Sequence, residues 1–111
     1  MGTTIEIQPL KGDQLLRYTV FAHYCGGTPH CQCLGCDVTF LDFLEMDHVN
    51  GDGKEHRAAN NLGTGGARLW RHLRDEGYPA GYQVLCCNCN SSKGRGPACK
   101  LAGRPHCQHN S

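Results

Sequence analysis

The chain has 111 residues, among them 15 glycines and nine cysteines, and its formal net charge is +1. A chain of this length forms one small domain with a modest hydrophobic core, so we expect an additional stabilising element such as a bound metal. No apolar run approaches the about 20 residues that span a membrane, and the N-terminus lacks the basic and apolar segments of a secretion signal. We therefore expect a cytoplasmic protein without a membrane partner, whose cysteines are reduced.

The net charge is divided unevenly along the chain. Residues 1–55 carry three basic and eight acidic side chains, a net charge of −5, whereas residues 56–111 carry eight basic and two acidic side chains, a net charge of +6. A basic half of this kind predicts a surface that contacts nucleic-acid phosphates, although a solvated charged face without a partner has the same composition. The expected DNA contacts are Arg57, Arg68, Arg71, Arg74, Lys93 and Arg95.

The first half of the chain predicts a helix followed by a strand. Asp13 is a good N-cap, and the helix of residues 13–24 that follows it presents Leu16, Val20 and Tyr24 on one face before two glycines end it. Residues 25–36 form a loop rich in Cys, Gly and Pro, and residues 40–49, which are largely apolar, predict a strand. The sequence Asn-Gly-Asp-Gly at 50–53 predicts a turn.

The second half predicts a helix, a strand and a short helix. Residues 67–76 have helical periodicity, with Leu69, Trp70 and Leu73 on one side and the arginines on the other, and Gly77 ends the helix. Residues 82–85 predict a strand, and residues 90–93 a short helix. Residues 98–111 form an irregular tail rich in Cys and His, outside a core of about 13–97. One repeat stands out: Pro-His-Cys-Gln occurs at 29–32 and again at 105–108.

Two Cys-x-x-Cys pairs carry the strongest chemical signal. A two-residue gap lets one tight turn present both sulfurs of a pair, and four thiolates satisfy the tetrahedral coordination of a structural zinc ion. We expect Cys33, Cys36, Cys86 and Cys89 to bind one zinc ion, and Cys87, between two of them, to be a packing residue. The alternative, that these are buried free cysteines, does not account for the spacing of both pairs.

An Asp-His dipeptide lies between the two pairs, and an asparagine follows the second pair directly. The order Cys-x-x-Cys, Asp47-His48, Cys-x-x-Cys-Asn90, within the stretches LEMDHVNGDGKEHR (44–57) and YQVLCCNCNSSKG (82–94), resembles the HNH endonucleases of phages, a family also called ββα-metal or His-Me finger nucleases. The resemblance covers roughly residues 15–99 and includes nucleases of the recombination endonuclease VII type and short phage proteins with homing roles.

The resemblance implies a fold, a reaction and a set of site residues. The fold is small α+β, a zinc-stabilised ββα-metal motif with flanking short helices. The reaction is metal-dependent hydrolysis or nicking of DNA, with Asp47 and Asn90 binding Mg²⁺ or Mn²⁺ and His48 acting as the general base. His56 is a weaker candidate for the catalytic site, and a second copy of the chain is a candidate partner beside DNA.

Other features of the sequence leave alternatives open. The middle asparagine of the family pattern is replaced by Gly81, and Asn50, Asn60 or Asn61 could take its role. Cys99, Cys107 and His109 are similar to the second zinc site of His-Cys-box nucleases, with Cys25, Cys31 or His30 as a fourth ligand. One competing function is a non-catalytic zinc-stabilised DNA-binding module, which would not need Asp47, His48 and Asn90 together. The other is a zinc-ribbon-like protein-interaction module, which the arginine stripe of Arg68, Arg71 and Arg74 disfavours.

Overall fold

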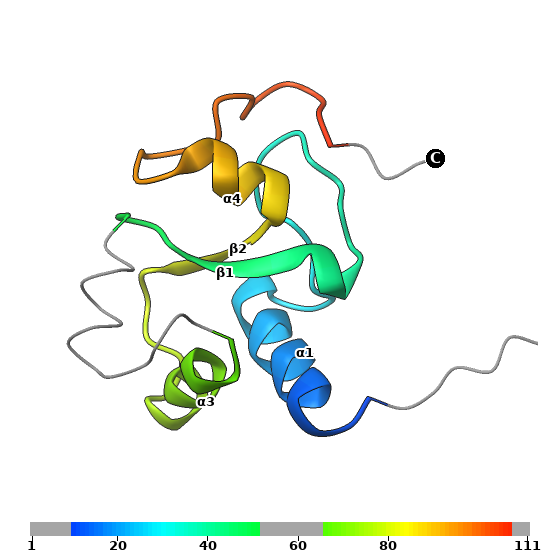
Figure 1. The fold of residues 1–111 in the computed structure, drawn as a ribbon, viewed down its shortest axis with the longest axis vertical. Coiled ribbons are helices and arrows are strands. Elements are labelled where there is room, and N and C mark those ends of the chain that lie inside the picture. The colour runs from blue at the N-terminus through cyan, green and yellow to red at the C-terminus, as the bar shows by residue number, and fades with distance from the viewer. Residues whose placement is uncertain (1–9, 52–65, 108–111) are drawn as a thin grey trace, which may run out of the picture.

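The computed structural model describes residues 10–51 and 66–107. They form a small α+β fold of three α-helices and one two-stranded antiparallel sheet. The sheet lies between helix α4 on one side and helices α1 and α3 on the other (Figure 1). The sequence therefore predicted the fold class correctly at the level of a small α+β domain.

The sheet consists of β1 (Leu44–His48) and β2 (Tyr82–Cys86). Its register pairs Leu44 with Cys86 and His48 with Tyr82, so the Asp-His dipeptide lies at the end of the sheet where β2 begins. β1 is shorter than the strand predicted over 40–49, because a 3-10 turn, η1 (Leu41–Phe43), precedes it. The guanidinium of Arg17 donates a 2.6 Å hydrogen bond to the carbonyl of Leu44, where the turn gives way to the strand.

Helices α1 (Gly12–Cys25) and α3 (Ala67–Asp75) form the core on one face of the sheet. Val20 and Phe21 of α1 and Leu73 of α3 are fully buried. The ring of Trp70 packs edge-on against Phe21 at a centroid distance of 5.8 Å. Gly26 ends α1 in the left-handed conformation with φ of 71°, as the two consecutive glycines predicted.

Helix α4 (Cys87–Lys93) follows β2 without a loop and begins three residues before the predicted helix of residues 90–93. The difference has a local cause: the sulfur of Cys86 accepts a 3.5 Å hydrogen bond from the Cys89 amide and so caps the helix. A thiol acts here in the place usually taken by a Ser, Thr, Asp or Asn oxygen.

The described part of the tail, residues 98–107, packs against the loop that holds the first Cys-x-x-Cys pair. The Gly103 amide donates to the Leu34 carbonyl at 2.9 Å, and the His106 amide donates to the Gly35 carbonyl at 3.0 Å. Gly35 has a φ of +95°, and a Cβ at this position would collide with the carbonyl oxygen of Arg104. Only glycine allows the tail to come this close to the loop.

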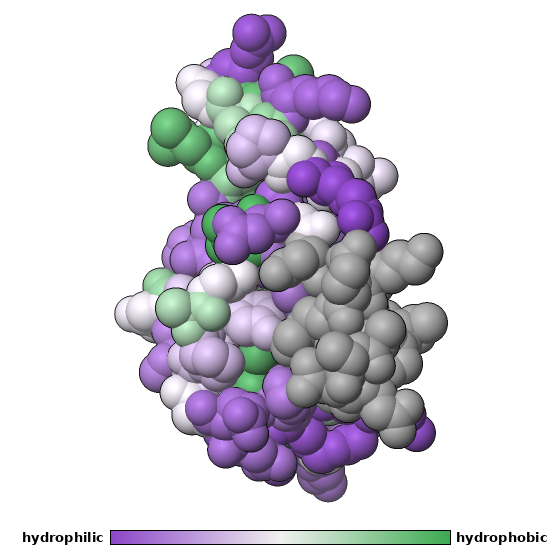
Figure 2. Space-filling model, turned by 90° about the vertical axis from the view of Figure 1, so that its left-hand side faces the viewer, coloured by the Kyte–Doolittle hydropathy of each residue, from purple (hydrophilic) through white to green (hydrophobic). Residues whose placement is uncertain are grey.

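The surface is mostly polar on the side of the molecule that Figure 2 presents. Among its coloured atoms, hydrophilic residues predominate and hydrophobic ones form small separate patches. None of the helices in the described part of the chain combines the length and the apolarity needed to cross a bilayer.

Candidate functional site

Two overlapping groups of side chains in the described residues could hold a metal ion. The first, called here the four-cysteine group, contains Cys31, Cys36, Cys86 and Cys89; the second, the cysteine–histidine group, contains Cys33, Cys89, Cys99 and His106. In each group the ligand atoms lie within 4.8 Å of one another. Every cysteine in either group is free of a disulfide, so these donors are suited to a structural metal such as zinc.

The predicted zinc ligands are therefore redistributed between two groups. Cys33 and Cys36 of the first Cys-x-x-Cys pair lie in different groups, and Cys31 takes the position expected for Cys33. The cause is an interaction between Gln32 and Val84, which are distant in sequence, and the Cys-x-x-Cys spacing does not reveal it. Gln32 binds both the amide and the carbonyl of Val84 at 2.7 Å, which ties the segment containing Cys31 to strand β2.

His106 is a metal-ligand candidate that the sequence analysis did not select. Its Nδ1 lies 2.6 Å from the carbonyl oxygen of Arg104, which can only accept, so Nδ1 is the nitrogen that donates and the lone pair of Nε2 faces the three sulfurs. The Nε2 atom lies 3.4 Å from the sulfur of Cys33, 3.3 Å from that of Cys89 and 3.7 Å from that of Cys99. A metal-binding histidine typically has this arrangement, with one nitrogen held by a carbonyl and the other facing the ion.

The repeated tetrapeptide was the sequence signal for Cys31 and His106. Pro-His-Cys-Gln at 29–32 supplies Cys31 to the four-cysteine group, and the same tetrapeptide at 105–108 supplies His106 to the cysteine–histidine group. The two copies thus provide different members, a cysteine from one and a histidine from the other.

Burial and hydrogen bonds shift the pKa values of the thiols in the two groups. Burial raises the pKa of Cys33 to about 11 and also raises the pKa values of Cys36 and Cys89. For Cys99 the effect of burial is outweighed by hydrogen bonds, first among them the one from the Leu101 amide, and its pKa falls to about 7. The first three thiols are therefore protonated without a metal, and metal binding must displace their protons.

The three remaining cysteines lie outside both groups. Cys25 contacts the backbone of His30, and neither residue belongs to a metal-binding group, although both were considered as the fourth ligand of the second site. Cys87 is exposed, not packed as predicted. Cys107 is half-buried, and its carbonyl oxygen lies 3.9 Å from the sulfur of Cys36.

Asp47 and His48 are both buried at the end of β1. The Asp47 Oδ2 atom accepts a 2.9 Å hydrogen bond from Gln83, its partner across the sheet, and lies 3.2 Å from the Lys93 ammonium. Both of these contacts go to Oδ2 and neither goes to Oδ1. The His48 ring packs against Tyr82 at a centroid distance of 4.8 Å.

Lys93 does not lie on the surface expected for a DNA contact. Its side chain is fully buried, and besides pairing with Asp47 it donates a 3.1 Å hydrogen bond to the carbonyl of His48. One lysine thus neutralises the buried carboxylate and fixes the strand end that carries the Asp-His dipeptide. The periodicity of a seven-residue helix is too short to distinguish this inward-facing lysine from a surface lysine.

Asn90, predicted to bind the catalytic metal together with Asp47, contacts the carboxylate of another residue of β1. Its side-chain amide donates a 2.7 Å hydrogen bond to Glu45, which lies two residues before Asp47 on the same face of β1. Neither candidate metal group in the described residues includes Asp47. Gly81, at the position where the family pattern has an asparagine, accepts a 2.9 Å hydrogen bond from the Val49 amide through its carbonyl.

A shallow pocket of about 310 Å³ lies directly after the Asp-His dipeptide. It is lined by Val49 and Asn50 from the end of β1 and by Arg95, Gly96 and Pro97 from the segment after α4. Beside this pocket the backbones of Gly51 and Arg95 come close together. Gly51 has a φ of +70°, and a Cβ there would lie 2.5 Å from the carbonyl oxygen of Arg95. Arg95 is therefore a predicted DNA contact that the fold brings close to the dipeptide.

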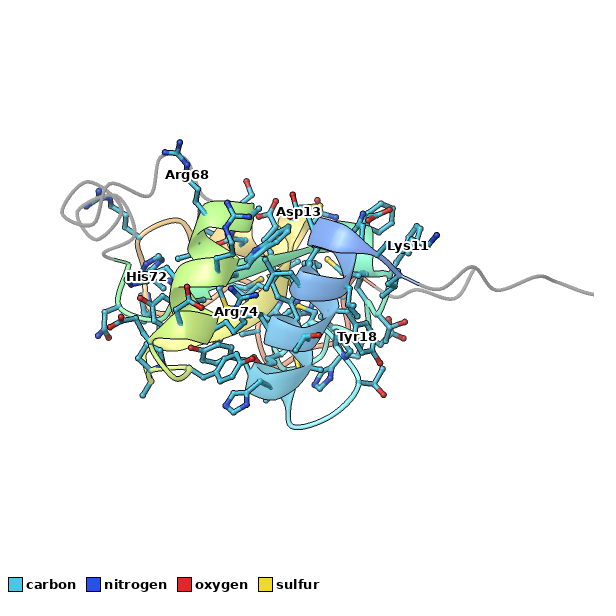
Figure 3. The ribbon with its side chains drawn as sticks, turned by 90° about the horizontal axis from the view of Figure 1, so that it is seen from below. Lys11, Asp13, Tyr18, Arg68, His72 and Arg74 are labelled. Atoms are coloured by element: carbon cyan, nitrogen blue, oxygen red, sulfur yellow. The ribbon has the colours of Figure 1, made fainter. Side chains whose placement is uncertain are left out.

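The arginines of α3 form a separate basic surface. Helix α3 lies beside α1, and Arg68 extends from the N-terminal end of α3 (Figure 3). Arg71 and Arg74 are exposed and form weak ion pairs with Asp13 at 3.7 Å and Asp75 at 3.1 Å. These pairs are too exposed to prevent the arginines from contacting a phosphate.

Several predicted residues lie outside the described part of the chain. They are His56, Arg57, Asn60, Asn61 and His109. Comparison of the chain with protein-family models, curated proteins and solved structures gave no match.

Proposed function

We propose that the protein is a metal-dependent DNA endonuclease or nickase of the HNH type. The observation that carries the proposal is the pair Asp47-His48, buried at the end of β1 immediately before a pocket that contains Arg95. A carboxylate and an imidazole next in sequence to a pocket lined by a guanidinium are groups suited to phosphodiester hydrolysis.

In this proposal each group has one task. Asp47 would hold a Mg²⁺ or Mn²⁺ ion, which would supply positive charge against the negative charge that develops on the phosphate and on the departing oxygen. His48 takes the proton from the attacking water, and Arg95 holds the substrate phosphate in the pocket. Cleavage then leaves 5′-phosphate and 3′-hydroxyl ends, as in the family that the sequence resembles.

Two contacts of the site residues, Lys93 with Asp47 and Asn90 with Glu45, bear on how a catalytic metal would bind. Lys93 holds Oδ2 of Asp47, so the metal binds beside an existing cation and its affinity is reduced by their repulsion. Asn90 would offer its side-chain oxygen to the metal as the second ligand, while its amide nitrogen donates to Glu45 and fixes the orientation of the side chain. These contacts lead us to expect weak metal binding before DNA is present, since the phosphate supplies negative charge to the site.

The same contacts favour a second candidate function, a zinc-stabilised module that binds DNA without cutting it. In such a protein the Asp47–Lys93 pair and the Asn90–Glu45 hydrogen bond are purely structural. The exposed arginines of α3 serve either function equally.

Plasmid nicking in Mg²⁺ or Mn²⁺ distinguishes the two candidates. We expect the wild-type protein to nick supercoiled plasmid, omission of added Mg²⁺ and Mn²⁺ to stop it, and His48→Ala to reduce the rate about 10²–10⁴-fold. His30→Ala is the matched control, because His30 lies in neither metal group and its Nδ1 atom lies 2.9 Å from the nearby Thr28 carbonyl. Plasmid binding without nicking would identify the protein as a binding module, and a His48→Ala rate equal to wild type would show that His48 is not the general base.

A further inference from the structure

The sulfur of Cys89 belongs to both metal-binding groups. Cys89 is completely buried at the first turn of α4 and is a member of the four-cysteine group and of the cysteine–histidine group. The two groups contain seven different residues in all. Two closed tetrahedral sites need eight ligand positions, so both can be complete only if one residue is shared.

The distances within the groups agree with tetrahedra around zinc. Bond lengths of about 2.3 Å to sulfur and about 2.0–2.1 Å to nitrogen give edges of about 3.8 Å between two sulfurs and about 3.6 Å between a sulfur and a nitrogen. The sulfurs of Cys36 and Cys86 are 3.8 Å apart. The Nε2 atom of His106 lies 3.3–3.7 Å from its three sulfur neighbours.

Hydrogen bonding alone does not satisfy this arrangement around His106. With its proton on Nδ1, the ring offers one lone pair at Nε2, and that lone pair can accept a hydrogen bond from one thiol. Three sulfurs nevertheless surround it at similar distances. A metal ion at the centre uses the nitrogen and all three sulfurs at once.

We propose that the chain binds two zinc ions in one binuclear centre, with the thiolate of Cys89 bridging them. The terminal ligands of one ion are Cys31, Cys36 and Cys86, and those of the other are Cys33, Cys99 and His106. A thiolate sulfur has enough lone pairs to bind two metal ions, and here it holds the start of α4 between them.

The binuclear centre joins three distant parts of the chain. The loop of residues 31–36, the junction of β2 and α4, and the tail of residues 99–106 meet at it. Since each structural zinc site contributes folding free energy, the second ion attaches the tail to the same point that holds the sheet to α4. This inference concerns the metal content of the protein and does not depend on whether it is a nuclease.

Zinc stoichiometry measured by native mass spectrometry tests the proposal. We expect two zinc ions per wild-type chain, and one in each of Cys31→Ser, Cys99→Ser and His106→Ala. Cys107→Ser and Cys87→Ser are matched controls, because both thiols are near the centre in sequence and lie in neither group; both should retain two ions. One ion in folded wild-type protein, or a disulfide among these cysteines, would overturn the proposal.

The bridge itself is tested on the wild-type chain, so that the result does not depend on a variant that folds. After replacement of zinc by ¹¹³Cd, we expect two cadmium resonances split by mutual coupling through the Cys89 sulfur. Two uncoupled resonances, with Cys107→Ser losing one ion, would instead assign Cys107 to the four-cysteine group and Cys89 to the other site alone. That result overturns the shared thiolate.

Discussion

The ammonium of Lys93 lies 3.2 Å from the carboxylate of Asp47, and hardly any of either side chain reaches solvent. Lys93 comes from the last turn of α4 and Asp47 from β1, so this ion pair connects the helix to the strand independently of the metal groups. Removing one member of a buried pair leaves the other charged and uncompensated, which costs more than the pair itself contributes.

Lys93→Met is therefore expected to lower the free energy of unfolding by about 3–5 kcal/mol, measured by urea denaturation of the zinc-loaded protein. The double variant Asp47→Asn/Lys93→Met removes both charges and should recover a large part of the loss. Arg74→Ala breaks the exposed pair with Asp75 and serves as the control, with an expected change within about 0.5 kcal/mol. A double variant no more stable than Lys93→Met would show that the two charges do not interact.

The proposed catalytic roles predict different responses to metal concentration. Asp47→Asn/Lys93→Met removes the charge of Asp47 without leaving Lys93 buried and uncompensated, so it should weaken metal binding, and a higher Mn²⁺ concentration should restore part of the nicking rate. His48→Ala should not respond, because its defect is the missing proton acceptor. The measurement is the nicking rate as a function of Mn²⁺ concentration. Equal recovery of both variants would contradict the assignment of His48 as the base.

Gly35 and Gly103 form a matched pair for testing how the tail attaches. Their φ angles are +95° and +94°, so alanine is strained equally at both, by about 1–2 kcal/mol. Only at Gly35 does a Cβ meet another part of the chain, the carbonyl of Arg104. Gly35→Ala should therefore destabilise the protein more than Gly103→Ala in urea and release zinc to a chelator faster. Equal behaviour of the two variants would show that close contact between tail and loop is not required.

The arginines of α3 are expected to contribute to DNA binding through phosphate contacts. Each such contact releases counterions, so Arg68→Ala/Arg71→Ala/Arg74→Ala should reduce the slope of log affinity against log salt by about 3. The pairs that this variant breaks are exposed, so the fold should be unaffected. Binding is measured by fluorescence anisotropy at several salt concentrations, and an unchanged slope would exclude α3 as the DNA-facing helix.

Removal of the structural metal should unfold the chain. The described core is small, and a structural zinc ion contributes on the order of 10 kcal/mol or more of apparent binding free energy at neutral pH. We expect a strong zinc chelator to abolish the helical circular dichroism signal and added zinc to restore it under reducing conditions. A metal-free chain with an unchanged spectrum would show that the hydrophobic core suffices.

The sequence alone determined most of the local structure. Apolar periodicity and glycine stops predicted α1 and α3 within a residue or two, because both helices are long enough to bury a regular stripe and end at a glycine in the left-handed conformation or just before one. It also predicted that the cysteines would meet around a metal, since the Cys-x-x-Cys spacing is a local requirement of coordination chemistry.

The tertiary structure decided which side chains share an ion and which way the polar residues face. Cys31 enters its metal group because the neighbouring Gln32 is bonded to Val84, and His106 enters its group because its amide donates to Gly35; both partners are distant in sequence. Lys93 faces inward because Asp47 lies opposite it across the helix–strand interface. Composition and spacing report the donors that a segment offers, but the choice among donors depends on distances between segments, which only packing sets.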